Sequence, residues 1–170
     1  MKIGIIGGGI FGVTIANRLA RSHKVEIFEK NDDILKAASD VNQCRVHRGY
    51  HYPRSDTTTN EVLESEEDFI DEYKDAIMTD TENYYCISKF DSHVSSEEYV
   101  KFCKRHNLEY TKINLDLVDK NSIDVCLKVK EYLFDHEILK RKCWEKLNKS
   151  GVTVHLNTIA DDEVYEKYDF

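Results

Sequence analysis

The chain has 170 residues, which is enough for one domain with a hydrophobic core and short for two full domains. Its 41% hydrophobic and 33% charged residues are typical of a globular protein rather than a disordered one. The net charge of −8 argues against a nucleic acid or an anionic membrane surface as a partner.

The spacing of the cysteines and the length of the apolar runs indicate the cellular compartment to expect for the protein. The five cysteines are odd in number, far apart and free of any C-x-x-C motif, so we expect reduced thiols rather than disulfides or a zinc site. No apolar run is long enough to span a bilayer, and glycines interrupt the apolar stretch near the N-terminus. We therefore expect a cytoplasmic protein with no transmembrane segment. The sequence does not predict its oligomeric state.

The first thirty residues alternate between strand and helix patterns. Residues 2–6 form a short apolar run, the pattern of a strand buried on both faces. Glycines follow, and between Ile10 and Arg21 apolar residues return at helical spacing. Residues 25–28 form a second apolar strand that ends at Glu29. This order predicts a βαβ unit with parallel strands and a right-handed crossover.

The turn of this unit carries the spacing G-x-G-x-x-G at Gly7, Gly9 and Gly12. The first glycine allows the tight turn, the second lets a pyrophosphate approach the backbone, and the third lets helix and strand pack closely. A carboxylate at Glu29 can accept both ribose hydroxyls of an adenosine and would repel a 2′-phosphate. The alternative is a glycine-rich turn without a ligand. The strand before it, the helix after it and Glu29 together favour dinucleotide binding.

The rest of the chain is polar and irregular at first and then alternates between elements. Residues 31–58 are predicted to be a long loop, and the helix after it to begin at Thr59 or Asn60, with ten carboxylates between Glu61 and Glu82 along its exposed face. The further expected elements are strands at 84–88, 125–134 and 152–156, helices at 96–106 and 135–148, and a strand that begins at 164.

Three segments resemble one flavoprotein family. The runs Ile5–Gly12 and Val25–Lys30 look like the start of the D-amino-acid-oxidase-like flavoproteins, which include glycerol-3-phosphate dehydrogenases, L-2-hydroxyglutarate oxidases and glycine or sarcosine oxidases. Residues 38–52 resemble the family's pattern of a serine, an asparagine and an I-H-x-G-x-x-Y core. Residues 154–159 look like the strand and turn that bring a backbone group to the adenine.

The resemblance implies an α/β fold with FAD as its cofactor. Residues 1–60 and 135–170 would form a Rossmann-like FAD-binding domain with a parallel sheet, and residues 61–134 part of an inserted substrate domain. Family members are considerably longer, so we expect a fragment or a truncated product. Ser39 would face the diphosphate, Arg45 and His47 would run along the flavin, and Ile159 would contact the adenine. The expected cofactor-binding residues are Gly7, Gly9, Ile10, Phe11, Gly12, Glu29, Lys30, Ser39, Arg45 and Ile159.

The expected function is that of an FAD-dependent oxidoreductase. By resemblance, it transfers a hydride from a small hydroxy- or amino-acid-type substrate to the flavin. His47 is the candidate catalytic residue, and a structural role in holding its loop is equally consistent. Arg45 and Arg48 could bind a substrate carboxylate or phosphate, or be solvated loop residues. No metal site is expected, because Gly49 and the following proline argue against a helix that would align His47 with a second histidine.

Two rival functions stay open at this point. A flavin enzyme without net redox chemistry, such as a sugar mutase, shares the opening turn. Such enzymes usually carry a paired-glycine segment after the second strand, and residues 31–49 lack it. The other rival is a non-catalytic nucleotide-binding fragment.

Overall fold

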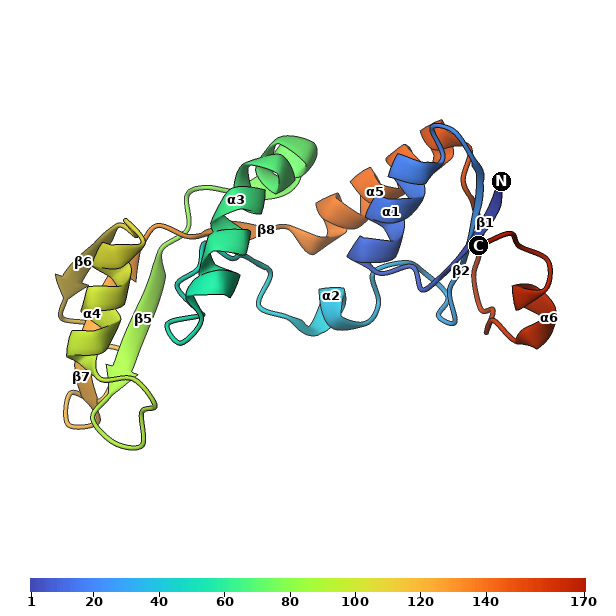
Figure 1. Ribbon diagram of the computed structural model, residues 1–170. Coiled ribbons are helices and arrows are strands. Elements are labelled where there is room, and N and C mark those ends of the chain that lie inside the picture. Colours follow the sequence, from blue (N-terminus) through green and yellow to red (C-terminus); the bar gives the residue numbers. More distant parts are fainter. The chain divides into compact units, whose positions relative to one another are not determined.

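The computed structural model describes residues 1–170, apart from the side chains of residues 163 and 165. The chain divides into two compact units (Figure 1). Unit 1 contains residues 1–44 and 135–170, and unit 2 contains residues 45–134. The first division falls between residues 44 and 45, whereas the sequence led us to expect a domain boundary near residue 60. Within the part of the chain that the structure describes, no helix has the length and apolar character needed to cross a membrane.

Unit 1 contains the predicted βαβ unit. Its elements are β1 (Lys2–Ile6), α1 (Ile10–Leu19), β2 (Lys24–Phe28), α2 (Ala38–Val41), α5 (His136–Ser150), β9 (Thr153–His155) and α6 (Asp162–Tyr165). The strands form a parallel sheet in the order β1-β2-β9. Strand β9, which is distant in sequence, thus pairs with the edge of β2 opposite to β1. Helices α1 and α5 lie side by side (Figure 1).

The two faces of this sheet differ in chemistry. Ile5, Ile27 and Val154 are in register and share one face, and a Cβ at position 12 of α1 would come within 3.5 Å of Ile5. This face is therefore the apolar one that α1 covers. The opposite face carries Glu26, and there the ring of Tyr168 lies 3.0 Å from where a Cβ at position 4 would be. A larger residue at position 4 of β1 would collide with that ring.

Glu26 is a buried carboxylate held by four partners. Its Oε2 lies 2.7 Å from Nε2 of His155 and accepts a 2.9 Å hydrogen bond from the Tyr168 hydroxyl. The ammonium groups of Lys2 and Lys24 lie 3.6 and 3.5 Å from its Oε1. The hydrogen bond with His155, with smaller help from Tyr168 and the two lysines, outweighs burial and lowers the pKa of Glu26 to about 2.

The strand predicted to begin at residue 164 is wrong. The chain forms α6 there, because the Asp161 side chain accepts a 3.1 Å hydrogen bond from the Val164 amide and caps the helix. Backbone hydrogen bonds then join the last two residues to β1, from Asp169 N to Lys2 O and from β1 back to Phe170 O. The C-terminal residues thus lie along the free edge of β1 without forming a regular strand.

Unit 2 is built from antiparallel strands and two helices. Its elements are β3 (Arg45–Val46), α3 (Asp56–Tyr73), the 3₁₀ helix η1 (Lys74–Ala76), β4 (Ile77–Met78), β5 (Asn83–Ser88), α4 (Ser96–Arg105), β6 (Tyr110–Ile113), β7 (Ile123–Val129) and β8 (Tyr132–Phe134). They form two three-stranded sheets, one in the order β3-β8-β4 and one in the order β5-β7-β6.

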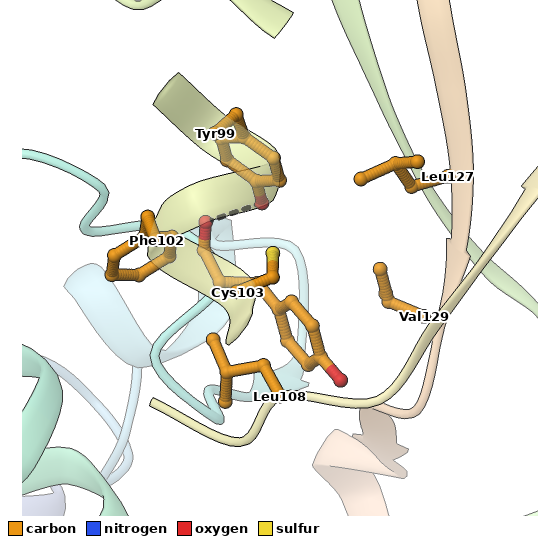
Figure 2. Packing of buried hydrophobic residues seen from close by; sticks show 7 residues of the cluster. Tyr99, Phe102, Cys103, Leu108, Leu127 and Val129 are labelled. Atoms are coloured by element: carbon orange, nitrogen blue, oxygen red, sulfur yellow. Dashed lines mark hydrogen bonds between the residues drawn. The ribbon is translucent and has the colours of Figure 1, made fainter. Parts of the chain in front are cut away.

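The core of unit 2 lies between α4 and the larger sheet (Figure 2). Its buried residues are Tyr50, Tyr99, Phe102, Cys103, Leu108, Leu127 and Val129. Helix α4 begins with a complete capping box between Ser95 and Glu98. Tyr50 is fully buried, although it belongs to the stretch predicted to be a polar loop. Its backbone carbonyl accepts a 2.7 Å hydrogen bond from the Tyr99 hydroxyl, drawn as the dashed line in Figure 2.

Two predicted boundaries in unit 2 are wrong. Helix α3 begins at Asp56, three residues early, because the Ser55 side chain accepts a hydrogen bond from the backbone of the first turn. It ends at Tyr73, where η1 and β4 take over. The strand predicted over residues 125–134 is interrupted at Lys130 and Glu131, where the chain leaves one sheet and enters the other.

The expectation of reduced cysteines is also wrong for one pair. Cys86 on β5 and Cys126 on β7 form a disulfide, and Cys44, Cys103 and Cys143 are not disulfide-bonded. The two bonded residues are direct partners in the antiparallel register, with their Cα atoms 4.2 Å apart. Their separation of 40 residues gave no sign of this pairing in the sequence.

We predict that Glu26 makes unit 1 sensitive to acid. Its pKa is lower in the folded protein than the ordinary value of 4.5, so the ionised carboxylate stabilises the fold above pH 4.5. That contribution is lost as the pH falls from about 4.5 to about 2. The difference in Tm between wild type and Glu26→Gln should therefore be largest above pH 4.5 and shrink below it. Exposed Glu64→Gln is the control, and an equal pH dependence in both variants would contradict the prediction.

We predict that reduction of Cys86–Cys126 destabilises unit 2. Closing a loop of about 40 residues restricts the unfolded chain by roughly 4 kcal/mol in the chain-entropy account, an upper limit for the effect. A reductant should lower the Tm of the wild type and leave that of the Cys86→Ser/Cys126→Ser double variant unchanged. Thiol counting in denaturant is the independent check, since five reactive thiols without reductant would mean that the pair is not oxidised.

Candidate functional site

The turn between β1 and α1 has the geometry that its three glycines predicted. Gly7 has a φ of +100°, a left-handed conformation that favours glycine, and its amide donates a 2.8 Å hydrogen bond to Phe28 O on β2. At Gly12 a Cβ would lie 2.0 Å from the Gly7 carbonyl oxygen, so the helix packs directly on the turn. At Gly9 a Cβ would meet nothing within 4 Å. The backbone at the start of α1 is therefore open.

Helix α1 presents this open backbone with partial positive charge. Gly9 is its N-cap and has no side chain to cap the helix, and the first turn carries no acidic residue. The first amides of a helix lack intrahelical partners and attract anions. An anionic group such as a diphosphate would find both open space and hydrogen-bond donors here.

Glu29 connects the end of β2 to the glycine turn. The residue is 7% exposed, and its Oε2 accepts a 2.6 Å hydrogen bond from the Gly8 amide. Its Oε1 accepts bonds from the Asn31 backbone and side chain at 2.9 and 2.7 Å. The Glu29 carbonyl also accepts a 2.9 Å bond from Thr158, which fixes the turn after β9. Each carboxylate oxygen has two lone pairs, so Glu29 keeps capacity for a further donor.

A second segment covers the glycine turn, and the sequence did not predict it. The Leu35 amide donates a 2.9 Å hydrogen bond to Gly8 O, and Leu35 has a left-handed φ of 60°. His136 Nε2 lies 3.3 Å from Leu35 O, and Trp144 donates a 2.8 Å hydrogen bond to Asp33 in the same segment. Helix α5 therefore holds residues 33–35 against the turn. No local pattern connects residues about one hundred positions apart.

The remaining unit 1 candidates lie on the surface around this turn or on neighbouring segments. Ile10 and Phe11 begin α1, and Phe11 is 83% exposed. Lys30 is exposed directly after Glu29, and Ser39 is half-buried in α2. Ile159 is 78% exposed and follows the turn that Glu29 fixes. The structure thus groups Ile10, Phe11 and Lys30 with the glycine turn, and leaves large apolar side chains open to solvent.

Arg45 and His47 belong to unit 2, where they meet a buried carboxylate that the sequence analysis missed. The Glu131 side chain is 0% exposed and lies 3.2 Å from Arg45 Nη1 and 3.5 Å from His47 Nδ1. It also accepts bonds from the Arg48 amide at 3.3 Å and the Tyr85 hydroxyl at 3.2 Å. Burial, together with the nearby Glu131 charge, raises the pKa of Tyr85.

Arg48 has its own carboxylate. Its Nε lies 3.2 Å from Oε2 of Glu66, a buried residue on the helix whose carboxylates were all expected to face solvent. Burial raises the pKa of Glu66, and Arg48 opposes that shift. Neither Arg45 nor Arg48 is thus a solvated loop residue. A substrate anion would have to compete with Glu131 or Glu66 for them.

The alternation of the sequence contained a signal for Glu131. Val125, Leu127 and Val129 point to the core side of β7, and position 131 continues the same phase. A carboxylate in an inward position predicts a buried charge that needs partners. Among the described residues, no group of three or more His, Cys, Asp or Glu side chains is arranged to hold a metal ion.

Comparison with known families supports the dinucleotide geometry. The sequence model of the family described as "DAO: FAD dependent oxidoreductase" matches residues 2–163. The chain belongs to this family of FAD-dependent oxidoreductases. The glycine turn, the open helix N-terminus and Glu29 are chemically suited to the family's cofactor, FAD, since they offer an anion site beside a ribose acceptor.

Similar FAD-dependent proteins are longer than this chain. The chain is 28% identical over 173 residues to the FAD-dependent monooxygenase kojA of Aspergillus flavus, covering 95% of this chain and 39% of that protein. It is 30% identical over 131 residues to the FAD-dependent monooxygenase FPY4 of Fusarium mangiferae, covering 76% of this chain and 36% of that protein. It therefore spans well under half the length of these relatives.

Solved structures share the fold of this FAD-dependent oxidoreductase. Glycine oxidase from Geobacillus kaustophilus matches with a TM-score of 0.69 at 14% identity, over 91% of this chain and 46% of that one. L-α-glycerophosphate oxidase from Mycoplasma pneumoniae, with FAD bound, matches with a TM-score of 0.69 at 16% identity, over 92% and 44%. These matches confirm the α/β fold with its parallel sheet.

We predict that alanine substitutions at two glycines of the turn differ strongly in their effect on stability. Gly12→Ala places a Cβ against the Gly7 backbone and should destabilise the protein by roughly 3 kcal/mol or prevent folding. Gly9→Ala meets no atom, and its φ of −70° suits alanine, so stability should change by less than about 1 kcal/mol. Chemical unfolding of both variants measures this, and equal losses would show that α1 does not pack on the turn as described.

Proposed function

We propose that the full-length protein holds FAD in unit 1 and oxidises a small substrate that carries a hydroxyl or amino group. The open backbone at Gly9, next to the carboxylate of Glu29, is the observation that carries this proposal. A diphosphate and a ribose need these two features side by side. Neither a purely structural turn nor a metal site needs a bare helix N-terminus beside an acceptor.

Each expected cofactor-binding residue has a role in this proposal. The amides at the start of α1 and the Ser39 hydroxyl would hold the diphosphate, and Glu29 would accept hydrogen bonds from the ribose of the adenosine half. Ile159 and Lys30 would contact the adenosine half. The residues proposed to contact FAD are Gly7, Gly9, Ile10, Phe11, Gly12, Glu29, Lys30, Ser39, Arg45 and Ile159.

FAD, when bound, supplies the acceptor for a hydride, and the protein supplies binding, orientation and acid–base groups. We assign the acid–base role to His47, because histidine is a common general acid or base and this ring is 37% exposed beside Glu131. In this assignment unit 1 is the FAD-binding domain and unit 2 is part of the substrate domain.

A second outcome of the flavin chemistry follows from the relatives. Both fungal proteins described above are named monooxygenases, so the full-length protein could transfer an oxygen atom from dioxygen instead of only removing hydrogen. The products separate the two: a substrate that has lost two hydrogens supports oxidation, and one that has gained an oxygen atom supports monooxygenation.

The oxidation state of the cysteines bears on the cellular compartment in which the protein works. The reduced thiols of Cys44, Cys103 and Cys143 favour the cytoplasm, whereas the Cys86–Cys126 disulfide favours an oxidising environment. The state of that pair in protein isolated under thiol-trapping conditions decides between them.

We predict that the purified chain binds FAD and that Gly9→Ala weakens this binding at least tenfold, or by about 1.4 kcal/mol. The added methyl group would occupy the approach of the diphosphate while leaving the fold intact. Quenching of flavin fluorescence during titration gives the Kd, and thermal melting of both proteins confirms equal folding. NAD is the control ligand. Binding of NAD without FAD, or equal FAD affinity in both proteins, would contradict the proposal.

A further inference from the structure

Glu131 is a charged group that the proposed function leaves unused. Its side chain is completely buried in unit 2, in the two-residue connection between β7 and β8. Burying a carboxylate is costly unless donors surround it, and buried charged groups of this kind often mark functional sites. Its backbone carbonyl accepts a 2.7 Å bond from the buried Asn83 side chain, which fixes the connection.

The two oxygens of Glu131 have different surroundings. Oε2 accepts hydrogen bonds from the Arg45 guanidinium and the Tyr85 hydroxyl, both at 3.2 Å. Oε1 accepts one bond, from the Arg48 amide at 3.3 Å. His47 Nδ1 lies 3.5 Å from this same Oε1. Arg45 therefore balances the charge through one oxygen, and the other oxygen keeps room for a second donor.

The His47 ring lies where it can supply the second donor to Oε1 of Glu131. Its Nδ1 is buried and makes no hydrogen bond of normal length within the described part of the chain. The nearest carboxylate is that of Glu131, and 3.5 Å is a long separation of the kind that catalytic pairs show before substrate binds. The ring as a whole is 37% exposed, so its exposed surface belongs to the other ring atoms. The rings of His51 and Tyr52 lie 5.5 and 5.9 Å away, measured between centroids.

We propose that Glu131 positions His47 by accepting a hydrogen bond from its protonated Nδ1. The lone pair then lies on Nε2, which acts as the general base. This inference rests on the proposed function and adds the residue that sets the orientation and tautomer of the base. The hydroxyl or amino proton of the substrate would be transferred to Nε2, while the hydride, with the electron pair of the C–H bond, would pass to the FAD of the proposed function as the two-electron acceptor. Glu131 itself exchanges no proton with the substrate.

The tautomer of His47 tests the inference without cofactor or substrate. In unconstrained neutral histidine the Nε2–H tautomer dominates, whereas acceptance by Glu131 requires Nδ1–H. Long-range ¹H–¹⁵N NMR spectra of the purified chain distinguish the two, and the His47→Gln variant identifies the signal of His47 among the seven histidines. We expect Nδ1–H in the neutral ring of the wild type. Nε2–H there would overturn the proposal.

Two variants separate positioning from general stabilisation. In Glu131→Gln, the donors of Arg45 and Tyr85 claim the remaining oxygen, so the amide nitrogen should face Nδ1 and shift His47 to Nε2–H. Glu66→Gln is the matched control, because Glu66 is also buried and pairs with Arg48. It should leave the tautomer unchanged. An identical response to both variants would contradict a specific role for Glu131.

The reactivity of Nε2 gives a second measurement. Diethyl pyrocarbonate attacks an unprotonated ring nitrogen, so Nε2 of His47 should react roughly threefold or more slowly in Glu131→Gln than in the wild type. If Glu131→Gln does not fold, the wild-type tautomer alone decides the question. Absence of FAD binding would overturn the proposed function while leaving the tautomer result readable, so the two failures are distinguishable.

Discussion

The hydrogen bond from the Gly8 amide to Glu29 is the constraint on which the geometry of unit 1 depends. It joins the turn after β1 to the end of β2. The same residue accepts from Asn31 and, through its carbonyl, from Thr158 after β9. Three connections at the carboxyl end of a parallel sheet therefore meet at one residue, two through its side chain and one through its backbone carbonyl, at the position where such sheets bind ligands. A ribose bound at this carboxylate would therefore affect all three connections.

The parts of this site that could be predicted are those determined by neighbours in the sequence. The spacing of Gly7, Gly9 and Gly12 after an apolar strand specified the turn, and the acid at the end of the second strand followed from the same unit. The contact of His136 with Leu35 could not be predicted, because it joins distant segments whose proximity exists only after folding. The C-terminal helix was missed for a local reason, since the cap at Asp161 outweighed the strand-like residues after it.

In unit 2 the missed features are charges and thiols that become neighbours across strands. Cys86 and Cys126 face each other only because β5 and β7 pair in one register, which a single sequence does not reveal. Glu131 was different, because its inward phase in the strand pattern was readable beforehand. What the sequence lacked was the identity of the partners, Arg45 and Tyr85, which other segments supply.

The position of unit 2 within the chain affects how the protein is made. Strand β2 pairs with β9 through Glu26 and Thr153, and all of unit 2 is translated between them. On the ribosome, β1, α1 and β2 emerge first, and one edge of β2 lacks its partner until the last strand is synthesised. The β5-β7-β6 sheet of unit 2 pairs segments that are closer in sequence than β2 and β9. It should form earlier, since contacts between nearby segments cost less chain entropy. The first and last strands of unit 2, β3 and β8, pair with each other. The points at which the chain enters and leaves folded unit 2 are therefore close together, which reduces the chain entropy that β9 loses when it pairs with β2.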